Sequence, residues 1–332
     1  NYHRNFIKIP IVAITGSNGK TTTKKLVKEV LSQKFNVKAT SGNLNNHIGI
    51  PLTLLSFTSN LDLGILEMGA NHQKEIEGYC KIAEPNYGYI TNYGKAHLEG
   101  FGGVEGVIKG KSELYDYLIK QQGLIFFNRD DQLQVERAIN HKNYSIGEHI
   151  LSDCRVNFVE ASPYVRVEYE KLDIQSHLIG DYNFKNIAAA IGIGRYFGVD
   201  KTAIKVAIEN FEAENMRSQI IEKKGLKIYM DAYNANPTSM EAALKSFKTM
   251  GDRPRIVILG DMFEIGDDTM KEHVHTIELC KQLNFEKIMV CGTHFMEAAK
   301  HEESVMSFEN TKALKHFLSD YEMPPSAFIM IK

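Results

Sequence analysis

Residues 11–24 read Ile-Val-Ala-Ile-Thr-Gly-Ser-Asn-Gly-Lys-Thr-Thr-Thr-Lys. The five apolar or β-branched residues predict a buried strand, and the segment after them predicts a phosphate-binding loop that opens a helix. Backbone N–H groups near Gly16 and Gly19 can turn toward phosphate oxygens because glycine adopts angles that other residues avoid, while the helix adds its positive end. We therefore expect a nucleotide site, with Lys20 on the terminal phosphates and Thr21 on Mg²⁺.

This loop is shorter than the usual phosphate loop. The pattern Gly-x-x-x-x-Gly-Lys-[Ser/Thr] places a glycine where this chain has Ile14. The segment Gly-Lys-Thr alone is common by chance. An apolar strand before it and a helical spacing of apolar residues after it nevertheless favour a functional loop. These residues are Leu26, Val27, Val30 and Leu31.

Length and composition indicate a globular protein of two domains, because 332 residues exceed the roughly 100–200 residues of one domain. The hydrophobic fraction is 43%, the charged fraction 24% and the formal net charge −2. Lys and Arg are spread out, so no nucleic-acid surface is expected, and no apolar run is long enough to span a membrane. Four cysteines without a Cys-x-x-Cys pair favour buried reduced thiols and a cytoplasmic location. We expect a monomer.

Two further strands end in polar residues that could meet the phosphate loop. Leu61–Glu67 is an apolar strand with an acidic end, and Tyr87–Thr91 precedes a glycine-flanked loop that contains His97. The carboxyl ends of parallel strands lie at one edge of a sheet, so Glu67 is expected beside Thr21, where it could hold Mg²⁺. Three interpretations of His97 stay open: a metal ligand, a phosphate contact, or an ordinary hydrogen-bonded loop residue.

Residue type alone leaves the roles of several lysines and asparagines open. Lys109 and Lys111 lie near the start of an amphipathic helix, where solvation is the ordinary interpretation. The Asn-rich loop at residues 42–46 favours a turn, although its amides could also contact a ligand. Asn183 could cap an alanine-rich helix expected over residues 187–197.

Apolar periodicity is lost around residues 210–218, and a new alternation of strands and helices begins after it. We therefore expect two domains, 1–212 and 213–332. The alternation predicts a largely parallel sheet in the second domain, with Thr238 or Ser239 as the cap of one helix.

Two segments of the first domain alternate apolar and charged residues, Val165–Tyr169 and Leu172–Ile174. This pattern is typical of half-exposed strands, so we expect the two to pair as antiparallel neighbours. Phe328–Ile331 is expected to form the last strand of the second domain.

Six motifs taken together resemble the Mur ligases of peptidoglycan synthesis. They are Thr15–Thr23, Gly42–Asn46, Leu66–Gln73, Ala96–Gly102, Asp231–Pro237 and Gly260–Met262. The resemblance runs along nearly the whole chain and accounts for the short phosphate loop. It implies an α/β fold, with a central P-loop ATPase domain of mostly parallel sheet followed by a Rossmann-like C-terminal domain. It also leads us to expect a UDP-binding domain before this sequence and a few residues after it.

The resemblance is strongest to family members that add D-alanyl-D-alanine, and it implies an ATP-dependent ligase. In such enzymes ATP phosphorylates the terminal carboxylate of UDP-N-acetylmuramoyl tripeptide, and the amine of D-alanyl-D-alanine attacks the acyl phosphate to form an amide. Two anions meet in this reaction, so cations are expected to dominate the site. The implied cofactors are ATP, two Mg²⁺ ions and a carbamylated lysine.

The same resemblance assigns individual residues. Thr21 and Glu67 are expected to hold one Mg²⁺, and His97 with carbamylated Lys111 a second, although Lys109 is close enough to be the modified lysine instead. The expected nucleotide contacts are Gly16, Ser17, Asn18, Gly19, Lys20, Thr21, Thr22, Asn183, Asn186, Arg217 and Asp231. The last two would reach ATP as the C-terminal domain closes. The expected catalytic residues are Lys20, His97 and Lys111, and the expected substrate contacts are Asn45, Asn46, Asn234 and Asn236.

Two other interpretations stay open. Folylpolyglutamate synthase shares the chemistry and lacks the UDP-binding domain, but the asparagine loop and the Asp231–Pro237 motif favour the D-alanyl-D-alanine ligases. A nucleotide-dependent switch module without ligase activity would need neither a second metal nor a carbamate, so the presence of His97 and Lys111 argues against it. We expect this stretch of chain to bind ATP but to ligate poorly without a UDP site.

Overall fold

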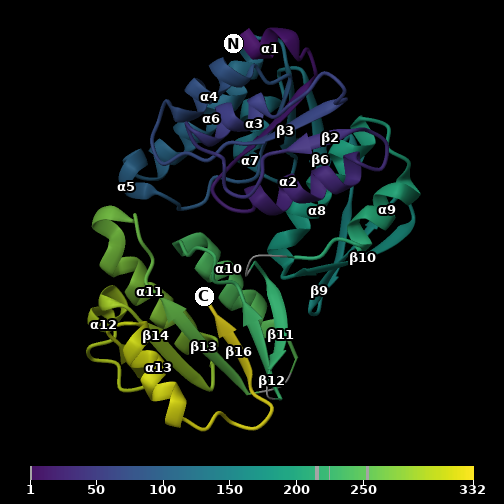
Figure 1. Cartoon of the computed structure of the whole chain (residues 1–332). Coiled ribbons are helices and arrows are strands. Elements are labelled where there is room, and N and C mark those ends of the chain that lie inside the picture. Colours follow the sequence, from purple (N-terminus) through teal and green to yellow (C-terminus); the bar gives the residue numbers. More distant parts are fainter. Residues whose placement is uncertain (1, 214–216, 224, 252–253) are drawn as a thin grey trace.

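The structure is a computed structural model that describes residues 2–213, 217–223, 225–251 and 254–332. Strands in these residues form three sheets, and Figure 1 shows them divided between an upper and a lower part of the molecule. The upper part carries the N-terminus, and the last strand of the lower part points toward the upper part (Figure 1). The α/β class predicted from the sequence is confirmed.

The first sheet is parallel and has the order β2-β3-β1-β4-β5-β6-β7. Its strands are β1 (Ile11–Thr15), β2 (Val37–Ala39), β3 (Leu63–Glu67), β4 (Tyr87–Ile90), β5 (Leu124–Asn128), β6 (Asn143–Gly147) and β7 (Cys154–Arg155). Ile14 pairs with Glu67, and Thr15 pairs with Ile90. The carboxyl ends of β3, β1 and β4 therefore lie side by side at one edge, where the phosphate loop begins.

Helices cover both faces of the first sheet. They are α1 (Tyr2–Phe6), α2 (Lys20–Leu31), α3 (Gly49–Leu55), α4 (Glu75–Ala83), α5 (Leu98–Phe101), α6 (Val104–Lys120), α7 (Gln132–Ala138), α8 (Phe184–Tyr196) and α9 (Lys201–Glu209). Along β1, Ile11 and Ala13 share a core with α3, α4 and α6, whereas Val12 and Ile14 share a core with α2, α8 and α9. Burial on both faces explains the uninterrupted apolar run of β1.

A small antiparallel sheet follows, with the order β10-β9-β8. Its strands are β8 (Asn157–Ala161), β9 (Tyr164–Tyr169) and β10 (Leu172–Ile179). The antiparallel pair predicted from charge alternation is confirmed. β10 extends beyond the predicted end at Ile174, because burial keeps alternating along the strand while the buried position after Gln175 is the polar Ser176, which hides the pattern in the sequence.

The third sheet has the order β11-β12-β16-β13-β14-β15. Its strands are β11 (Gln219–Lys223), β12 (Leu226–Met230), β13 (Arg255–Gly260), β14 (Lys287–Cys291), β15 (Val305–Phe308) and β16 (Phe328–Ile331). Within this sheet, as far as its residues are described, the β11–β12 pair is antiparallel and the other pairs are parallel, so the predicted largely parallel sheet is confirmed. β11 is missing from the sequence-based prediction, since this half-exposed edge strand has no regular alternation.

Helices also cover both faces of the third sheet. They are α10 (Pro237–Thr249), α11 (Thr269–Gln282), α12 (Thr293–Ala298) and α13 (Thr311–Asp320), with short 3₁₀ turns η1 (Asp181–Asn183) and η2 (Gly266–Asp268) elsewhere in the chain. Buried residues of α10, α11 and α12 share one core, and Leu314 of α13 belongs to a separate core on the other face.

The cap of α10 differs from the predicted one. The side-chain oxygen of Asn236, rather than that of Thr238 or Ser239, accepts a hydrogen bond from the backbone N–H of Ser239 at 2.9 Å. Ser239 Oγ in turn accepts from the Asn236 N–H at 3.1 Å, which completes a capping box. The helix begins at Pro237, which fits the first helical position because it has no N–H to satisfy, and the cap therefore lies before it.

The predicted domain boundary at residues 212 and 213 adjoins residues 214–216, which lie outside the described residues, and it stays a prediction. In the part of the chain that is described, no helix has the length and apolar character needed to cross a membrane. All four cysteines are buried and unpaired, as predicted.

Candidate active site

The phosphate loop at residues 16–19 joins β1 to α2, which confirms the predicted strand, loop and helix. Gly16 and Gly19 have φ values of 136° and 81°. A Cβ on Gly19 would lie 2.5 Å from the side-chain oxygen of Asn186, and one on Gly16 would overlap the side chain of Thr91. Both positions need glycine, for backbone conformation and for space.

Lys20 lies over this loop. Its Nζ donates hydrogen bonds to the carbonyl oxygens of Gly16 at 2.8 Å and Ser17 at 2.9 Å. Burial is the main cause that lowers the pKa of Lys20 to about 8, while Glu67 acts to raise this pKa and Arg217 acts to lower it. The ammonium is thus placed to exchange two carbonyl contacts for phosphate oxygens.

Glu67 lies beside Thr21, where the parallel-sheet argument predicts it. Thr21 Oγ1 donates to Glu67 Oε1 at 3.0 Å, and Asn45 Nδ2 donates to the same oxygen at 2.8 Å. The other carboxylate oxygen lies 3.0 Å from Lys24 Nζ. A hydroxyl and a buried carboxylate are hard oxygen ligands of the kind that Mg²⁺ prefers, so this pair fits the ion.

Lys24 is a site residue that the sequence analysis missed. Its side chain is only 3% exposed and is paired with the equally buried Glu67. Its Nζ also donates to the carbonyl of Gly42 in the asparagine loop, at 3.2 Å. The available signal was periodicity, because Lys24 precedes Val27 by three residues and Leu31 by seven, which places a lysine on the buried face of α2.

Lys111 and Lys109 differ in environment, although both lie on α6. Lys111 is fully buried, whereas Lys109 is exposed. Lys111 Nζ donates to the carbonyl of Ala70 at 2.9 Å and lies 4.7 Å from the centroid of the Phe101 ring. Burial lowers the pKa of Lys111 well below its usual value. A neutral amine is the form that adds to CO₂, so a carbamate fits Lys111 and does not fit Lys109.

His97 lies in the loop before α5, with a left-handed backbone at φ 54°. Its Nδ1 contacts Oε2 of Glu264, which belongs to the loop after β13. Burial lowers the pKa of His97, against the opposing effect of the Glu264 carboxylate. A neutral imidazole can bind a metal through one nitrogen, so the donor chemistry of His97 fits a ligand. Within the described residues no cluster of three or more His, Cys, Asp or Glu could hold a metal by itself.

Asn183 and Asn186 form a buried pair behind the phosphate loop. Asn186 Nδ2 donates to Asn183 Oδ1 at 2.8 Å, and Thr23 Oγ1 donates to Asn186 Oδ1 at 3.0 Å. Asn183 makes no side-chain cap of α8, and its Nδ2 instead donates to the carbonyl of Ile179 at 2.7 Å. The interpretation of Asn183 as a helix cap is therefore wrong, since the 3₁₀ turn before α8 takes its side chain into the interior.

Two asparagines that are expected to contact substrate make local hydrogen bonds to the backbone. Asn46 Oδ1 accepts from the N–H of Gly49 at 2.9 Å, and Asn234 Oδ1 accepts from the N–H of Ala235 at 2.9 Å. The turn interpretation of Asn46 thus has direct support. Asn45, in contrast, points its amide at Glu67, and Asn236 caps α10.

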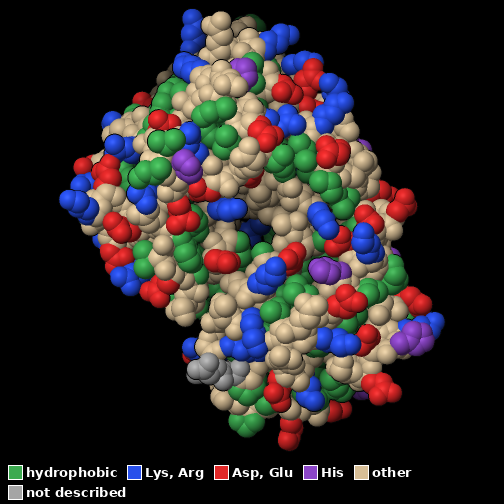
Figure 2. Space-filling model, turned by 180° about the vertical axis from the view of Figure 1, so that it is seen from behind, with side chains coloured by type: hydrophobic (Ala, Val, Ile, Leu, Met, Phe, Trp, Pro, Cys, Tyr) green, Lys and Arg blue, Asp and Glu red, His purple; other side chains and the backbone are tan. Residues whose placement is uncertain are grey.

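Contacts between the upper and lower parts converge on the phosphate loop and on the loop that follows β4. Asn236 Nδ2 donates to Asn18 Oδ1 at 2.7 Å, and Lys95 Nζ pairs with Glu272 at 2.6 Å. Figure 2, which views the molecule from behind, shows a hollow at this junction with Lys and Arg side chains near its rim. The structure therefore brings the phosphate loop next to the second part of the chain.

Arg217 and Asp231 lie on the lower side of this junction. The Arg217 guanidinium lies 3.6 Å from the centroid of the Tyr233 ring. Asp231 pairs with Lys332 Nζ at 2.6 Å and accepts from the Ser218 N–H at 3.3 Å. The charge of Arg217 lies close enough to lower the pKa of Lys20. Asp231 is already paired with Lys332 and would have to give up this ion pair to contact a nucleotide.

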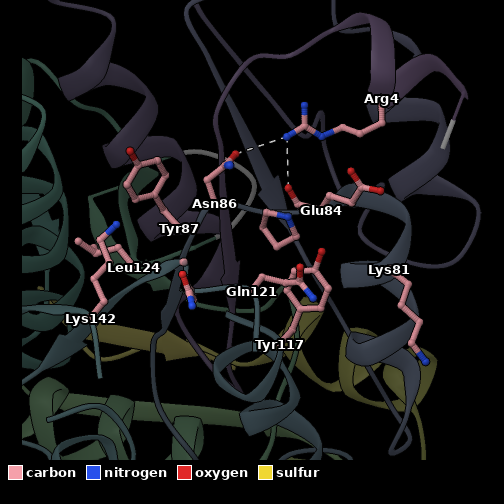
Figure 3. A pocket seen from close by; sticks show the side chains of 12 residues that line it. Arg4, Lys81, Glu84, Asn86, Tyr87, Tyr117, Gln121, Leu124 and Lys142 are labelled. Carbon is pink, nitrogen blue, oxygen red and sulfur yellow. Dashed lines mark hydrogen bonds between the residues drawn. The ribbon is translucent and has the colours of Figure 1, made fainter. Parts of the chain in front are cut away.

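A pocket of about 820 Å³ lies at the opposite edge of the first sheet, and Figure 3 shows its side chains. Tyr87 and Leu124, which line it, begin β4 and β5, so the pocket faces the amino ends of the strands. Arg4 donates to the carbonyl of Glu84 at 3.2 Å and to the side chain of Asn86 at 3.4 Å (Figure 3). These polar groups bind one another, and the pocket is separated from the phosphate loop by the length of the strands.

Comparison with protein families identifies both parts of the chain. A model described as the Mur ligase middle domain matches residues 14–194, and one described as the Mur ligase, glutamate ligase domain matches residues 216–323. The chain belongs to the Mur ligase family. The short phosphate loop, Lys111 and the Asn183–Asn186 pair all lie within the range of the middle-domain match.

Among Mur ligases, UDP-N-acetylmuramoyl-tripeptide–D-alanyl-D-alanine ligase of Bacillus subtilis is 35% identical over 315 residues. These residues cover 93% of this chain and 66% of the Bacillus protein, so the chain spans less than two thirds of that relative. A crystal structure of MurF from Acinetobacter baumannii has a TM-score of 0.89 and 29% identity, and covers 100% of this chain and 75% of the solved one. MurF ligase of Thermotoga maritima, solved in complex with ADP, shares the fold with a TM-score of 0.84 at 22% identity, over 99% of this chain and 78% of that one.

Proposed function

We propose that this Mur ligase uses ATP to join D-alanyl-D-alanine to UDP-N-acetylmuramoyl tripeptide through an amide bond. One observation carries the proposal: Lys20, Thr21 and Glu67 meet at the carboxyl edge of the first sheet, on the side that faces the second part of the chain. The names of the relatives supply the choice of substrates. Because ATP and a UDP-linked peptide are cytoplasmic compounds, we place the reaction in the cytoplasm, and a monomer remains our expectation.

We assign the nucleotide to the phosphate loop and its neighbours. The backbone N–H groups of the loop would bind phosphate oxygens, and the Lys20 ammonium would contact the terminal phosphates. The residues assigned to nucleotide are Gly16, Ser17, Asn18, Gly19, Lys20, Thr21, Thr22, Asn183, Asn186, Arg217 and Asp231. The Asn183–Asn186 pair supports this choice because Asn186 packs directly against Gly19.

Two pairs of side chains would hold Mg²⁺. Thr21 and Glu67 form one pair, and His97 with a carbamylated Lys111 forms the other. Bound Mg²⁺ would neutralise the negative charge of the phosphates. Carbamylation would replace a buried amine by an anion, and burial, which lowers the pKa of Lys111, favours the neutral amine that reacts with CO₂.

The reaction joins two anions in its first step. A carboxylate oxygen of the tripeptide forms a bond to the γ-phosphorus as the bond from that phosphorus to ADP breaks, which gives an acyl phosphate. The Lys20 ammonium would stabilise the charge on the transferred phosphoryl group. In the second step the neutral amine of D-alanyl-D-alanine bonds to the acyl carbon, loses a proton, and inorganic phosphate leaves.

The substrate side is assigned to asparagines on both sides of the junction. Asn45 reaches Glu67, and Asn236 reaches the phosphate loop, so both amides lie next to the proposed site of phosphoryl transfer. The side chains of Asn46 and Asn234 bind the backbone next to these neighbours, and we assign both to the peptide substrate as well.

A single assay tests the proposed function. ADP release by the full-length protein is measured with ATP, Mg²⁺ and UDP-N-acetylmuramoyl tripeptide, with and without D-alanyl-D-alanine. We expect sustained release only when both substrates are present, and Lys20→Ala to abolish it. Release that ignores D-alanyl-D-alanine but responds to folate and glutamate would instead assign a folylpolyglutamate synthase. Nucleotide binding without any substrate-dependent release would indicate a switch module.

A further inference from the structure

The loop after β13 presents one carboxylate to the other part of the molecule. Met262 and Ile265 are buried, whereas Phe263 between them is 67% exposed and the Glu264 side chain is 51% exposed. The start of the loop is fixed because Asp261 accepts hydrogen bonds from the first N–H groups of α12, at 3.0 Å and 2.9 Å. The Glu264 side chain therefore projects from a loop whose start is fixed by hydrogen bonds.

Glu264 meets His97 across the junction. Glu264 Oε2 contacts His97 Nδ1, and the Glu264 carbonyl accepts from the N–H of Glu99 at 3.2 Å. His97 and Glu264 both have left-handed backbones, with φ values of 54° and 60°. Non-glycine residues rarely adopt this conformation, and where they do the surrounding structure holds them in it, often at functional sites. The contact thus joins two loops that are each constrained to present one side chain.

A carboxylate on one ring nitrogen determines what the other nitrogen of a histidine can do. When Nδ1–H donates to a carboxylate, the neutral ring carries no proton on Nε2, and Nε2 can bind a metal. Histidines that bind metals through one nitrogen commonly donate the other N–H to a carboxylate, which fixes the orientation of the ring.

We propose that Glu264 is a positioning residue that holds the His97 ring with Nε2 free for the second Mg²⁺, so that this carboxylate of the second domain itself strengthens the binding of the ion. This inference rests on the proposed function, because that function supplies the second ion. It adds a residue of the second domain to a metal site otherwise built from the first. Neither His97 nor Glu264 has to change its charge for this coupling.

Mn²⁺ binding to the protein with saturating ADP, in bicarbonate buffer, tests the inference without measuring catalysis. Electron paramagnetic resonance counts the bound ions and gives their affinities. We expect two Mn²⁺ per wild-type protein, and Glu264→Ala to weaken the second ion about 10-fold while the first ion and ADP bind as before. Glu264→Gln, whose amide oxygen can still accept from Nδ1–H, should recover most of the loss.

The chain offers a matched control in Glu272, which also reaches across the junction but pairs with Lys95 at 2.6 Å. We expect Glu272→Gln to leave the affinity of both ions unchanged. Wild-type affinity for the second ion in Glu264→Ala would overturn the inference, as would an equal loss in Glu272→Gln, which would mean that the contact only docks the domains. One Mn²⁺ in the wild-type protein would also overturn it, whereas failure to bind ADP at all would contradict the proposed function itself. Thermal melting of each variant confirms that it is folded.

Discussion

Asn18 in the phosphate loop and Asn236 at the start of α10 exchange amide hydrogen bonds across the junction between the two parts of the chain. Asn236 Nδ2 donates to Asn18 Oδ1 at 2.7 Å, and Asn18 Nδ2 donates to Asn236 Oδ1 at 3.3 Å. The same Asn236 oxygen caps α10 by accepting from Ser239 N–H. One side chain therefore links the phosphate loop to the first turn of a helix in the other part.

The double role of Asn236 predicts a graded response to substitution. Asn236→Ala removes both the cap and the amide pair, and we expect a loss of about 1 kcal/mol of stability from the cap alone. Asn236→Ser keeps an oxygen that can cap the helix and should recover most of this loss, although it cannot exchange amides with Asn18. Denaturant unfolding followed by circular dichroism checks the order. A serine variant as unstable as the alanine variant would rule out the cap as the source.

The lowered pKa of Lys20 leads us to expect that ADP affinity depends on pH. Its pKa is about 8 in the nucleotide-free protein because of burial, and bound phosphate, which is an anion, must raise this pKa. Affinity should therefore be nearly constant below about pH 7 and should fall up to about 10-fold per pH unit above about pH 8, with uptake of a proton on binding.

Calorimetric titration at several pH values measures this dependence. The matched control is Lys20→Arg, because the guanidinium stays protonated throughout the range and should remove the pH dependence even where it weakens binding. An affinity of the wild-type protein that stays flat from pH 7 to 9.5 would contradict the assignment of Lys20 to phosphate.

The buried pair Lys24–Glu67 predicts a large effect on stability. The two side chains are 3% and 2% exposed, so Lys24→Met would leave a buried carboxylate without its cation, at a cost of about 3 kcal/mol. Lys28→Met is the control on the same helix, because Lys28 and Glu29 are 43% and 45% exposed and should contribute at most about 0.5 kcal/mol. Addition of Glu67→Gln to Lys24→Met should recover part of the loss. Equal destabilisation by the two lysine variants would refute this account of Lys24.

The proposed carbamate on Lys111 can be observed directly. In ¹³C-bicarbonate, the wild-type protein should show a carbamate carbon signal by NMR that is absent from Lys111→Ala and retained in Lys109→Ala. The physical reason is that Lys111 is buried with a lowered pKa, whereas Lys109 is exposed. The signal should also decrease on acidification, because protonated amines do not add to CO₂. A spectrum without this signal at saturating bicarbonate would remove the carbamate from the proposed site.

Sequence patterns predicted the parts of this site that lie within one strand–loop–helix unit. The apolar run before Gly16, the glycines and the helix after Lys20 identify the loop without any tertiary information. Parallel-sheet geometry also placed Glu67 beside Thr21, because the carboxyl ends of neighbouring strands must meet.

Contacts between residues that are far apart in the sequence are harder to predict. Lys24 has the periodicity of a buried position, but only the fold shows that Glu67 faces it. Glu264 lies 167 residues from His97 in the sequence, and no local pattern connects the two. The cap at Asn236 was missed because two hydroxyl residues follow Pro237 and the choice among three candidate caps depends on where the helix begins.

Transfer of oxygen from substrate to phosphate tests the central claim most directly. The full-length protein is incubated with ATP, Mg²⁺, D-alanyl-D-alanine and UDP-N-acetylmuramoyl tripeptide whose terminal carboxylate carries ¹⁸O in both oxygens. The masses of the products are then measured by mass spectrometry. The account predicts a UDP-N-acetylmuramoyl pentapeptide together with inorganic phosphate that carries one ¹⁸O atom. ADP formation with unlabelled phosphate, or without a pentapeptide, would contradict it.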